Sequence, residues 1–178
     1  MKKLALAATL VTLSFAASAD GWRFAPLLTD PSFKLEPSIA LTANRVDPKD
    51  GNWDTSMGID FNFNCGLLQD PQNRMRTHIN ISRSDDDGVS VNAFELSPRY
   101  TVPMGQGLSV GVGPSLAVYK VSGRGYDETL LAAGVAAGIN YRAGALFLGA
   151  DVRYHNTEEK RGADFNNWTM GLKAGVNF

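Results

Sequence analysis

The chain has 178 residues, of which 44% are hydrophobic and 20% are charged, and its formal net charge is −1. This length suits a single domain, and the balanced charge excludes the strongly basic composition that is typical of nucleic-acid-binding proteins. Because the sequence holds one cysteine, Cys65, it also excludes a fold held together by internal disulfides.

Residues 1–19 have the three parts of a secretory signal peptide. Lys2 and Lys3 precede an apolar run, and the run ends in the small residues Ala-Ser-Ala, which form a typical cleavage site. We therefore expect cleavage after Ala19 and export of the mature chain. Residues 20–32 are too polar and too interrupted by proline for a strand, so we expect them to precede the main domain, which would span 33–178.

From residue 33 onward, hydrophobic residues recur at every second position. In 53–65, Met57, Ile59 and Phe61 alternate with small or polar residues, and only a β-strand places two such sets on opposite faces. The stretch is longer than the average globular strand of about 5–6 residues and long enough to cross a bilayer, which takes about 9–11. The same pattern predicts eight strands, at 33–45, 53–65, 75–83, 89–102, 108–121, 131–142, 146–155 and 167–178.

The alternation changes phase within the fourth of these strands. Val89 and Val91 occupy odd positions, whereas Phe94 and Leu96 occupy even ones. One extra residue in the strand would produce this change, so we predict a β-bulge near Ala93.

The connections between the strands alternate in character. Four are polar or charged, "DPKDGN", "SDDDG", "SGRGYDE" and "NTEEKRGADFN", and the three others are mostly tighter turns. This arrangement predicts an up-and-down antiparallel barrel with both termini at the turn side. The acidic loop "SDDDG" lacks the spacing of an EF-hand, and its Asp-Gly ending is typical of a hairpin turn, so we predict no metal site there.

Eight-stranded barrels place their apolar face either inside, as lipocalins do, or outside, as membrane barrels do. The aromatic residues of the apolar face favour the second arrangement, because they fall near the two ends of the strands, where a bilayer has its two interfaces. Those expected near the loop side are Trp53, Tyr154 and Trp168, and those expected near the turn side are Phe63, Tyr100, Tyr141 and Phe178.

The polar face would then line the lumen. Eight strands leave room only for side chains, and charges buried there must pair or cost several kcal/mol each. We therefore predict a salt-bridged plug in which inward-facing glycines make room for long arginines. The alternative is a solvated face of a soluble antiparallel sheet. The charged residues concerned are Glu36, Asp60, Arg76, Glu95, Arg99, Arg142, Asp151, Arg153 and Lys173.

The leader, the eight alternating strands and the ending "GLKAGVNF" together resemble the small bacterial outer-membrane barrels of the OmpA, OmpX and opacity-protein type. The resemblance implies an all-β, eight-stranded transmembrane barrel in contact with outer-membrane lipid and lipopolysaccharide. Residues 20–32 would lie in the periplasm, where they would cap the barrel mouth or anchor through Trp22 and Phe24. The resemblance also implies that the barrel-insertion machinery recognises the last strand through Phe178. It says little about activity, because such barrels host many functions.

We expect a monomer with a structural or surface-interaction role and no cofactor. One alternative is a lipid A-modifying enzyme, since the lipid A deacylases carry a His-x-Ser pair on a late strand. Here the corresponding residues are His155 and Thr157. The final strand has no Glu, and Asp164 is the nearest acid after the loop. Alternation places His155 in the lumen, however, where it would bond to Asp151 or a loop carboxylate. A narrow pore and a soluble secreted barrel are the remaining alternatives.

Overall fold

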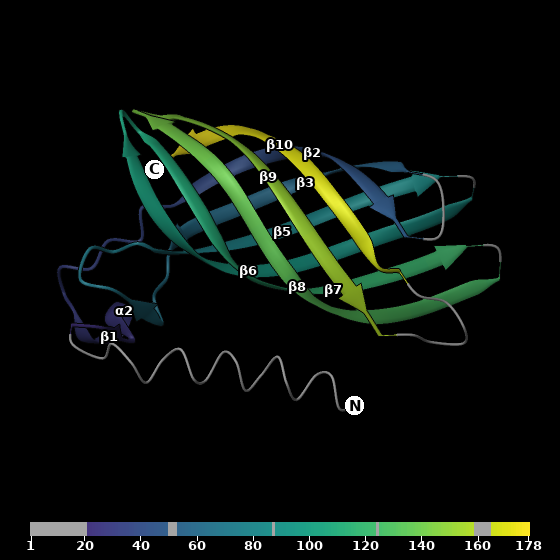
Figure 1. Cartoon of the computed structure of the whole chain (residues 1–178), viewed down its shortest axis with the longest axis horizontal. Helices are drawn as coiled ribbons and strands as arrows, with labels where there is room; N and C mark the ends of the chain where they lie inside the picture. The colour runs from purple at the N-terminus through teal and green to yellow at the C-terminus, as the bar shows by residue number, and fades with distance from the viewer. Residues whose placement is uncertain (1–20, 50–52, 87, 124, 159–164) are drawn as a thin grey trace.

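The computed structural model describes residues 21–49, 53–86, 88–123, 125–158 and 165–178, so the expected signal peptide at 1–19 lies outside the described residues. Eight long strands make up most of the fold: β2 (Ser38–Pro48), β3 (Asp54–Asn64), β5 (Met75–Asp86), β6 (Val89–Gly105), β7 (Leu108–Gly123), β8 (Tyr126–Ala143), β9 (Leu146–Thr157) and β10 (Asn167–Asn177). They form one closed barrel in the order β10-β2-β3-β5-β6-β7-β8-β9, as Figure 1 shows. Every neighbouring pair is antiparallel. The predicted fold class is therefore confirmed.

The two ends of the barrel differ in their connections. The connections that follow β2, β5, β7 and β9 lie at one end, here called the loop end. Those that follow β3, β6 and β8 lie at the other, here called the turn end, together with the first residues of β2 and the last residues of β10 (Figure 1). At the turn end the backbone N–H of Phe178 donates to the carbonyl oxygen of Pro37 at 2.9 Å. The final residue is thus bonded to the residue that precedes β2.

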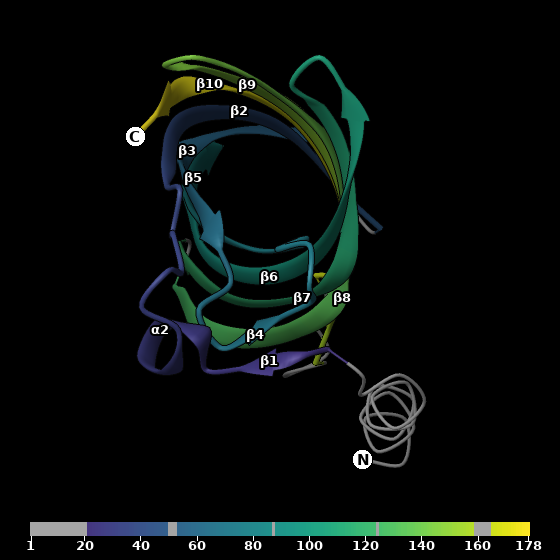
Figure 2. The same cartoon turned by 90° about the vertical axis from the view of Figure 1, so that its left-hand side faces the viewer.

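The segment before the barrel packs against the connection between β3 and β5. Two short strands, β1 (Arg23–Phe24) and β4 (Leu68–Gln69), pair with each other, and one helical turn, α2 (Pro26–Thr29), follows β1. The strand at β1 was not expected in this proline-rich segment. Figure 2 shows the segment to one side of the turn end.

Asp30 links residues on both sides of α2 within this segment. It forms an ion pair with Arg23 and accepts hydrogen bonds from the hydroxyl and the backbone N–H of Ser32, at 2.6 and 2.9 Å. The Ser32 hydrogen bonds, with the charge of Arg23, hold the pKa of the Asp30 carboxyl below its usual value.

The two faces of the barrel wall differ as the alternation predicts. Leu41 and Leu172 point outward and are 72% and 68% exposed, whereas their neighbours Thr42 and Lys173 point inward and are buried. An apolar outside around a polar inside is the arrangement of membrane barrels and the reverse of a lipocalin.

The β-bulge predicted near Ala93 is wrong. The pairing of β6 with β5 runs without a shift from Tyr100 to Val89, and the only shift in the described pairing of β6 with β7 lies between Pro103 and Gly105. The change in the sequence pattern has a different cause. Near the loop end the inward-facing residues of β6, such as Val91 and Ala93, are themselves apolar. Odd positions therefore face the lumen along the whole strand, and only the polarity of the inward-facing residues changes.

The strands from β5 to β9 are all longer than the sequence pattern predicts, and three of them are the longest of the barrel. β6, β7 and β8 have 17, 16 and 18 residues, whereas β2, β3 and β10 have 11 each. The β7–β8 pairing continues to Gly123 and Tyr126 at the loop end. The "SGRGYDE" stretch is therefore the tip of a long β-hairpin.

Gly134 of β8 sits where two strands approach closely. It pairs with Ser115 on β7 and His155 on β9, and a Cβ atom at this position would lie 1.7 Å from the carbonyl oxygen of Tyr154. Any side chain there must push β8 and β9 apart.

We predict that Gly134→Ala lowers the free energy of unfolding by about 1–3 kcal/mol, the usual cost of overpacking. The change is measurable by urea titration in detergent micelles. Ala133→Ser, at an exposed position on the outer face of the same strand, serves as the control and should leave the midpoint unchanged. Equal stability of the two variants would contradict the close approach.

Candidate functional site

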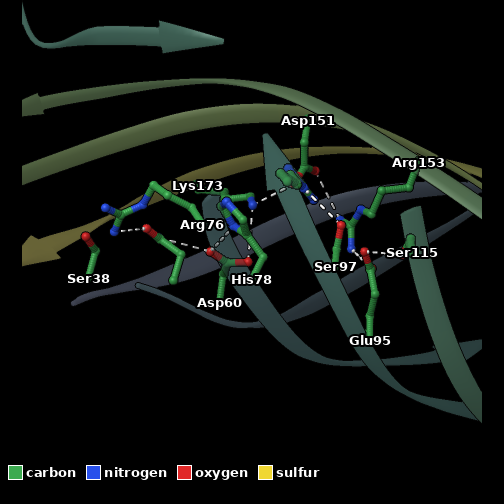
Figure 3. Close-up of polar contacts among 12 residues, drawn as sticks. Ser38, Asp60, Arg76, His78, Glu95, Ser97, Ser115, Asp151, Arg153 and Lys173 are labelled. Carbon is green, nitrogen blue, oxygen red and sulfur yellow. Dashed lines mark hydrogen bonds and ion pairs between the residues drawn. The ribbon is translucent and has the colours of Figure 1, made fainter. Parts of the chain in front are cut away.

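Six charged side chains inside the barrel form one continuous chain of ion pairs (Figure 3). At its centre the ammonium group of Lys173 lies 2.6 Å from Oδ2 of Asp151 and 3.2 Å from Oδ2 of Asp60. Nδ1 of His78 lies 3.2 Å from Oδ1 of Asp60. These four side chains come from β10, β9, β3 and β5, so the contacts join opposite parts of the wall.

Asp151 extends the chain toward the loop end. Its Oδ2 lies 3.3 Å from the guanidinium of Arg99, and its Oδ1 lies 3.3 Å from that of Arg153. Arg153 in turn donates to Oε2 of Glu95 at 2.7 Å. All of these side chains are buried. Three acids and three bases balance, which is what buried charges require.

Glycines on the inner face leave the space that these side chains occupy. A Cβ on Gly138 would lie 3.1 Å from a nitrogen of Arg99, and one on Gly171 would lie 3.1 Å from nitrogen Nη2 of Arg153. Gly171 is also flanked by Asn44, which accepts a hydrogen bond from Arg153 at 2.7 Å. The long arginine side chains therefore lie over backbone that has no side chain of its own.

The three other predicted lumen charges lie apart from this chain, at the turn end. Arg76 donates to the amide oxygens of Asn64 and Asn62 at 2.7 and 3.1 Å. Arg142 donates to the hydroxyl of Ser38 at 2.7 Å and to the same Asn62 oxygen. The side chain of Glu36 is exposed, and only its backbone carbonyl accepts from Arg76, at 2.8 Å.

His155 and Ser115 meet across Gly134. Oγ of Ser115 lies 2.8 Å from Nε2 of His155 and 2.8 Å from Oε1 of Glu95. On the other side of the imidazole ring, the hydroxyl of Tyr119 lies 2.9 Å from Nδ1. Both ring nitrogens of His155 thus have a hydroxyl partner.

The direction of these hydrogen bonds follows from the charge of Glu95. Its ion pair with Arg153 keeps the carboxylate ionised, so it can only accept hydrogen bonds. The Ser115 hydroxyl therefore donates to Glu95 and accepts from the Nε2–H of His155. A nucleophilic serine needs the reverse, with the histidine accepting the serine proton. This arrangement orders the lumen and does not activate a nucleophile.

His155 and Thr157, the described residues of the enzyme hypothesis, have different hydrogen-bond partners. Oγ1 of Thr157 accepts a hydrogen bond from the backbone N–H of Phe165 at 2.8 Å, and Asp164 lies outside the described residues. His155 is 1% exposed. Its hydrogen-bond partners are Ser115 and Tyr119, instead of the Asp151 or loop carboxylate expected from the sequence.

Apolar side chains close the lumen on both sides of the ionic chain. Toward the loop end the buried cluster is Ala117, Tyr119, Leu130 and Ala132, with Val91, Ala93, Val121 and Phe165 packed against it. Toward the turn end Phe147 is fully buried, and the guanidinium of Arg142 lies 5.5 Å from the centre of its ring. A cavity of about 30 Å³ remains beside Glu95 and Arg153, enough for one or two water molecules.

Sequence reasoning did not identify these apolar lumen residues. The signal was present for Tyr119 and Leu130, because strict alternation from Leu116 and Leu131 places both on the inner face. The sequence-based prediction treated the whole lumen as polar and therefore did not include these two residues.

The predicted interface aromatics all lie on the outer face or at its ends. Near the loop end the rings of Tyr154 and Trp168 are 4.9 Å apart, and the guanidinium of Arg45 lies 4.5 Å over the ring of Trp53. Near the turn end, Arg74 lies 4.8 Å over the ring of Tyr100. The remaining three are partly or largely exposed: Phe63, Tyr141 and Phe178.

In the described part of the chain, no group of three or more His, Cys, Asp or Glu side chains is arranged to hold a metal ion. No helix in the same part of the chain has the length and hydropathy that crossing a bilayer requires.

No protein-family model and no curated protein sequence matches the chain. Solved structures match its fold. Neisserial surface protein A (NspA) is 19% identical, with 80% of this chain and 95% of that one covered and a TM-score of 0.55. The N-terminal β-barrel domain of Pseudomonas aeruginosa OprF is 18% identical, with 82% and 100% covered and a TM-score of 0.59. The chain therefore has the fold of the small eight-stranded outer-membrane β-barrels, which confirms the resemblance at the level of the fold.

We predict that Lys173→Met lowers the free energy of unfolding by about 3–5 kcal/mol, because it leaves Asp60 and Asp151 buried without their shared cation. Urea titration in micelles measures the change. Lys120→Met removes the same charge from an exposed position on β7 and should change stability by no more than about 0.5 kcal/mol. A loss as small as that of the control would show that the ionic chain does not depend on Lys173.

Proposed function

We propose that the protein is an exported, monomeric barrel of the bacterial outer membrane with a closed lumen, whose role is structural and surface-interactive. Its turn end would face the periplasm and its loop end the cell exterior. The observation that carries this proposal is the filled lumen. A balanced chain of six buried charges lies between an apolar cluster toward the loop end and the buried ring of Phe147 toward the turn end.

The outer face supports placement in a membrane. Large apolar side chains cover the wall between the two ends and are exposed, among them Leu41, Met57 and Leu172. A contiguous apolar surface of this kind needs an apolar environment, and aromatic side chains near both ends suit the interfaces of a bilayer. Outer-membrane lipid and lipopolysaccharide are the environment that the proposal implies.

The loop end supports a surface role. The β7–β8 hairpin continues to Gly123 and Tyr126, and exposed polar residues such as Lys120 and Asp127 lie along it. The β5–β6 hairpin carries Arg83 and Asp85, which form an exposed ion pair at 2.7 Å. Rigid hairpins that present polar side chains are suited to contact with other molecules. The polar connection "NTEEKRGADFN", residues 156–166, is described only in part.

The enzyme alternative is less well supported. His155 and Ser115 are buried inside the wall, whereas an acyl-chain substrate would reach the protein from the lipid side. The hydrogen-bond direction from His155 to Ser115 to Glu95 also opposes nucleophilic attack by Ser115.

We predict that the purified protein gives no discrete conductance steps in planar-bilayer recordings, because the filled lumen leaves no continuous water path. The same preparation should be recovered from the outer-membrane fraction and should shift its gel mobility on boiling, which shows that it is folded. Unitary steps from the heat-modifiable form would favour the narrow-pore alternative. Recovery in the aqueous fraction without detergent would favour the soluble barrel.

We predict that deletion of Phe178 lowers the yield of folded, membrane-inserted barrel several-fold in cells. Phe178 is an exposed aromatic residue directly after β10, and its N–H donates to the carbonyl oxygen of Pro37. Phe178→Tyr keeps the ring and the backbone bond and is the matched control. The heat-modifiable fraction in purified outer membranes is the measurement, and equal insertion of the deleted chain would exclude a role of this residue in assembly.

A further inference from the structure

Arg76 and Arg142 come from opposite parts of the wall and converge at the turn end of the lumen. Both guanidinium groups donate to the same atom, Oδ1 of Asn62. Their remaining hydrogen bonds within the described residues are to Oδ1 of Asn64, the backbone carbonyl of Glu36 and the hydroxyl of Ser38. All of these acceptors are neutral.

This pair of cations lacks the charge balance of the central chain. Among the described residues, no carboxylate oxygen lies in ion-pair contact with either guanidinium. The exposed carboxylate of Glu36 attracts both electrostatically and offsets part of their charge without contacting them. Amide and hydroxyl oxygens satisfy donors but do not neutralise a charge. Two converging arginines in a partly dry site therefore attract an anion, since a buried charge without a counter-charge is costly.

Two polar groups at the same place have no hydrogen-bond partner within the described chain. They are Nε of Arg76 and the hydroxyl of Thr101. The residues that carry them are 8% and 7% exposed. Most buried polar groups in folded proteins are satisfied. Arg76 and Thr101 line the same cavity, so their unpartnered donor and hydroxyl favour an acceptor there.

A cavity of about 310 Å³ lies over these groups and opens at the turn end. Arg76, Thr101, Ser109 and Arg142 line it from the barrel wall, with Glu36 and Asn73 also among its lining residues. Its volume is at the lower end of the usual range for small-molecule sites, about 300–1,000 Å³. The segment formed by β1 and α2 lies to one side of this end (Figure 2).

We propose that this turn-end site binds a small phosphate-class oxyanion. Arginine guanidinium groups present planar pairs of donors that match the oxygens of phosphate, and the Thr101 hydroxyl supplies one more donor. The site is distinct from the proposed surface role at the loop end. It also holds in either membrane orientation, because it depends only on the geometry of the lumen.

The test is isothermal titration of the full mature protein, in phosphate-free maltoside micelles, with inorganic phosphate at constant ionic strength set by chloride. We expect saturable binding of one phosphate per barrel. Arg76→Gln and Arg142→Gln should each weaken binding about tenfold or more, as the loss of one charge-assisted contact does. Arg83→Gln, which removes a cation at the other end of the barrel, is the matched control and should bind as the unsubstituted protein does.

Two further variants sharpen the result. Glu36→Gln removes the one carboxylate that lines the cavity and should tighten binding, whereas Thr101→Val keeps the shape of the side chain and should weaken it. Each variant is first shown to be folded by its mobility shift on boiling.

Glycerol 3-phosphate, titrated in the same way, distinguishes two sources of the ligand. Equal affinity would mean that the site accepts a phosphate group carried on a larger molecule, and preference for inorganic phosphate would assign the free anion. Absence of saturable binding to both probes, or equal binding by the folded Arg76→Gln and Arg142→Gln variants, would overturn the proposal.

Discussion

The interior of an eight-stranded barrel is wide enough only for side chains, and this constraint determines what the molecule can hold and what it can do. A charge placed in that space cannot be solvated, so it must find a partner across the lumen. Lys173 lies between Asp151 on the neighbouring strand β9 and Asp60 on β3, with which β10 does not pair. The contacts of Lys173 with Asp60, of Arg99 with Asp151 and of Arg153 with Glu95 therefore link strands that do not pair with each other.

Because the lumen is filled in this way, most of its polar side chains are already engaged with one another. The residues that resemble catalytic groups, His155 and Ser115, are held as donors in a chain that ends on Glu95. The surface contacts and the anion site proposed above therefore lie at the two ends of the barrel. The loop end offers polar hairpins, and the turn end offers two arginines that no carboxylate of the described residues contacts.

Much of the fold could be predicted from the sequence, because a period of two has a single structural interpretation when it is repeated in eight long stretches. The inward or outward direction of residues such as Leu172 and Lys173 follows from the same alternation. Strand ends were least accurate at β2, which begins at Ser38 instead of 33, and at β8, which begins at Tyr126 instead of 131. At the loop end of β8 the wall lies beyond the apolar belt and no longer needs an apolar outer face, so the pattern fades.

Contacts across the lumen could not be predicted, because they depend on the register between strands that are distant in sequence. His155 reaches Ser115 only because Gly134 lies between them with no side chain. The error at Ala93 has a related origin. A change from polar to apolar residues on the inner face looks the same in the sequence as an extra residue in the strand.

The seam between β2 and β10 has a consequence for the way the chain acquires its structure. Ser38 donates a hydrogen bond to Asn177, 139 residues away, at 2.8 Å, and the pairing continues to Pro48 and Asn167. Such non-local contacts slow folding, and until the last strand is present both sheet edges are open to pairing with other chains. The export proposed above would therefore require the nascent protein to be shielded from aggregation, and a chain truncated before β10 would expose the same two edges permanently.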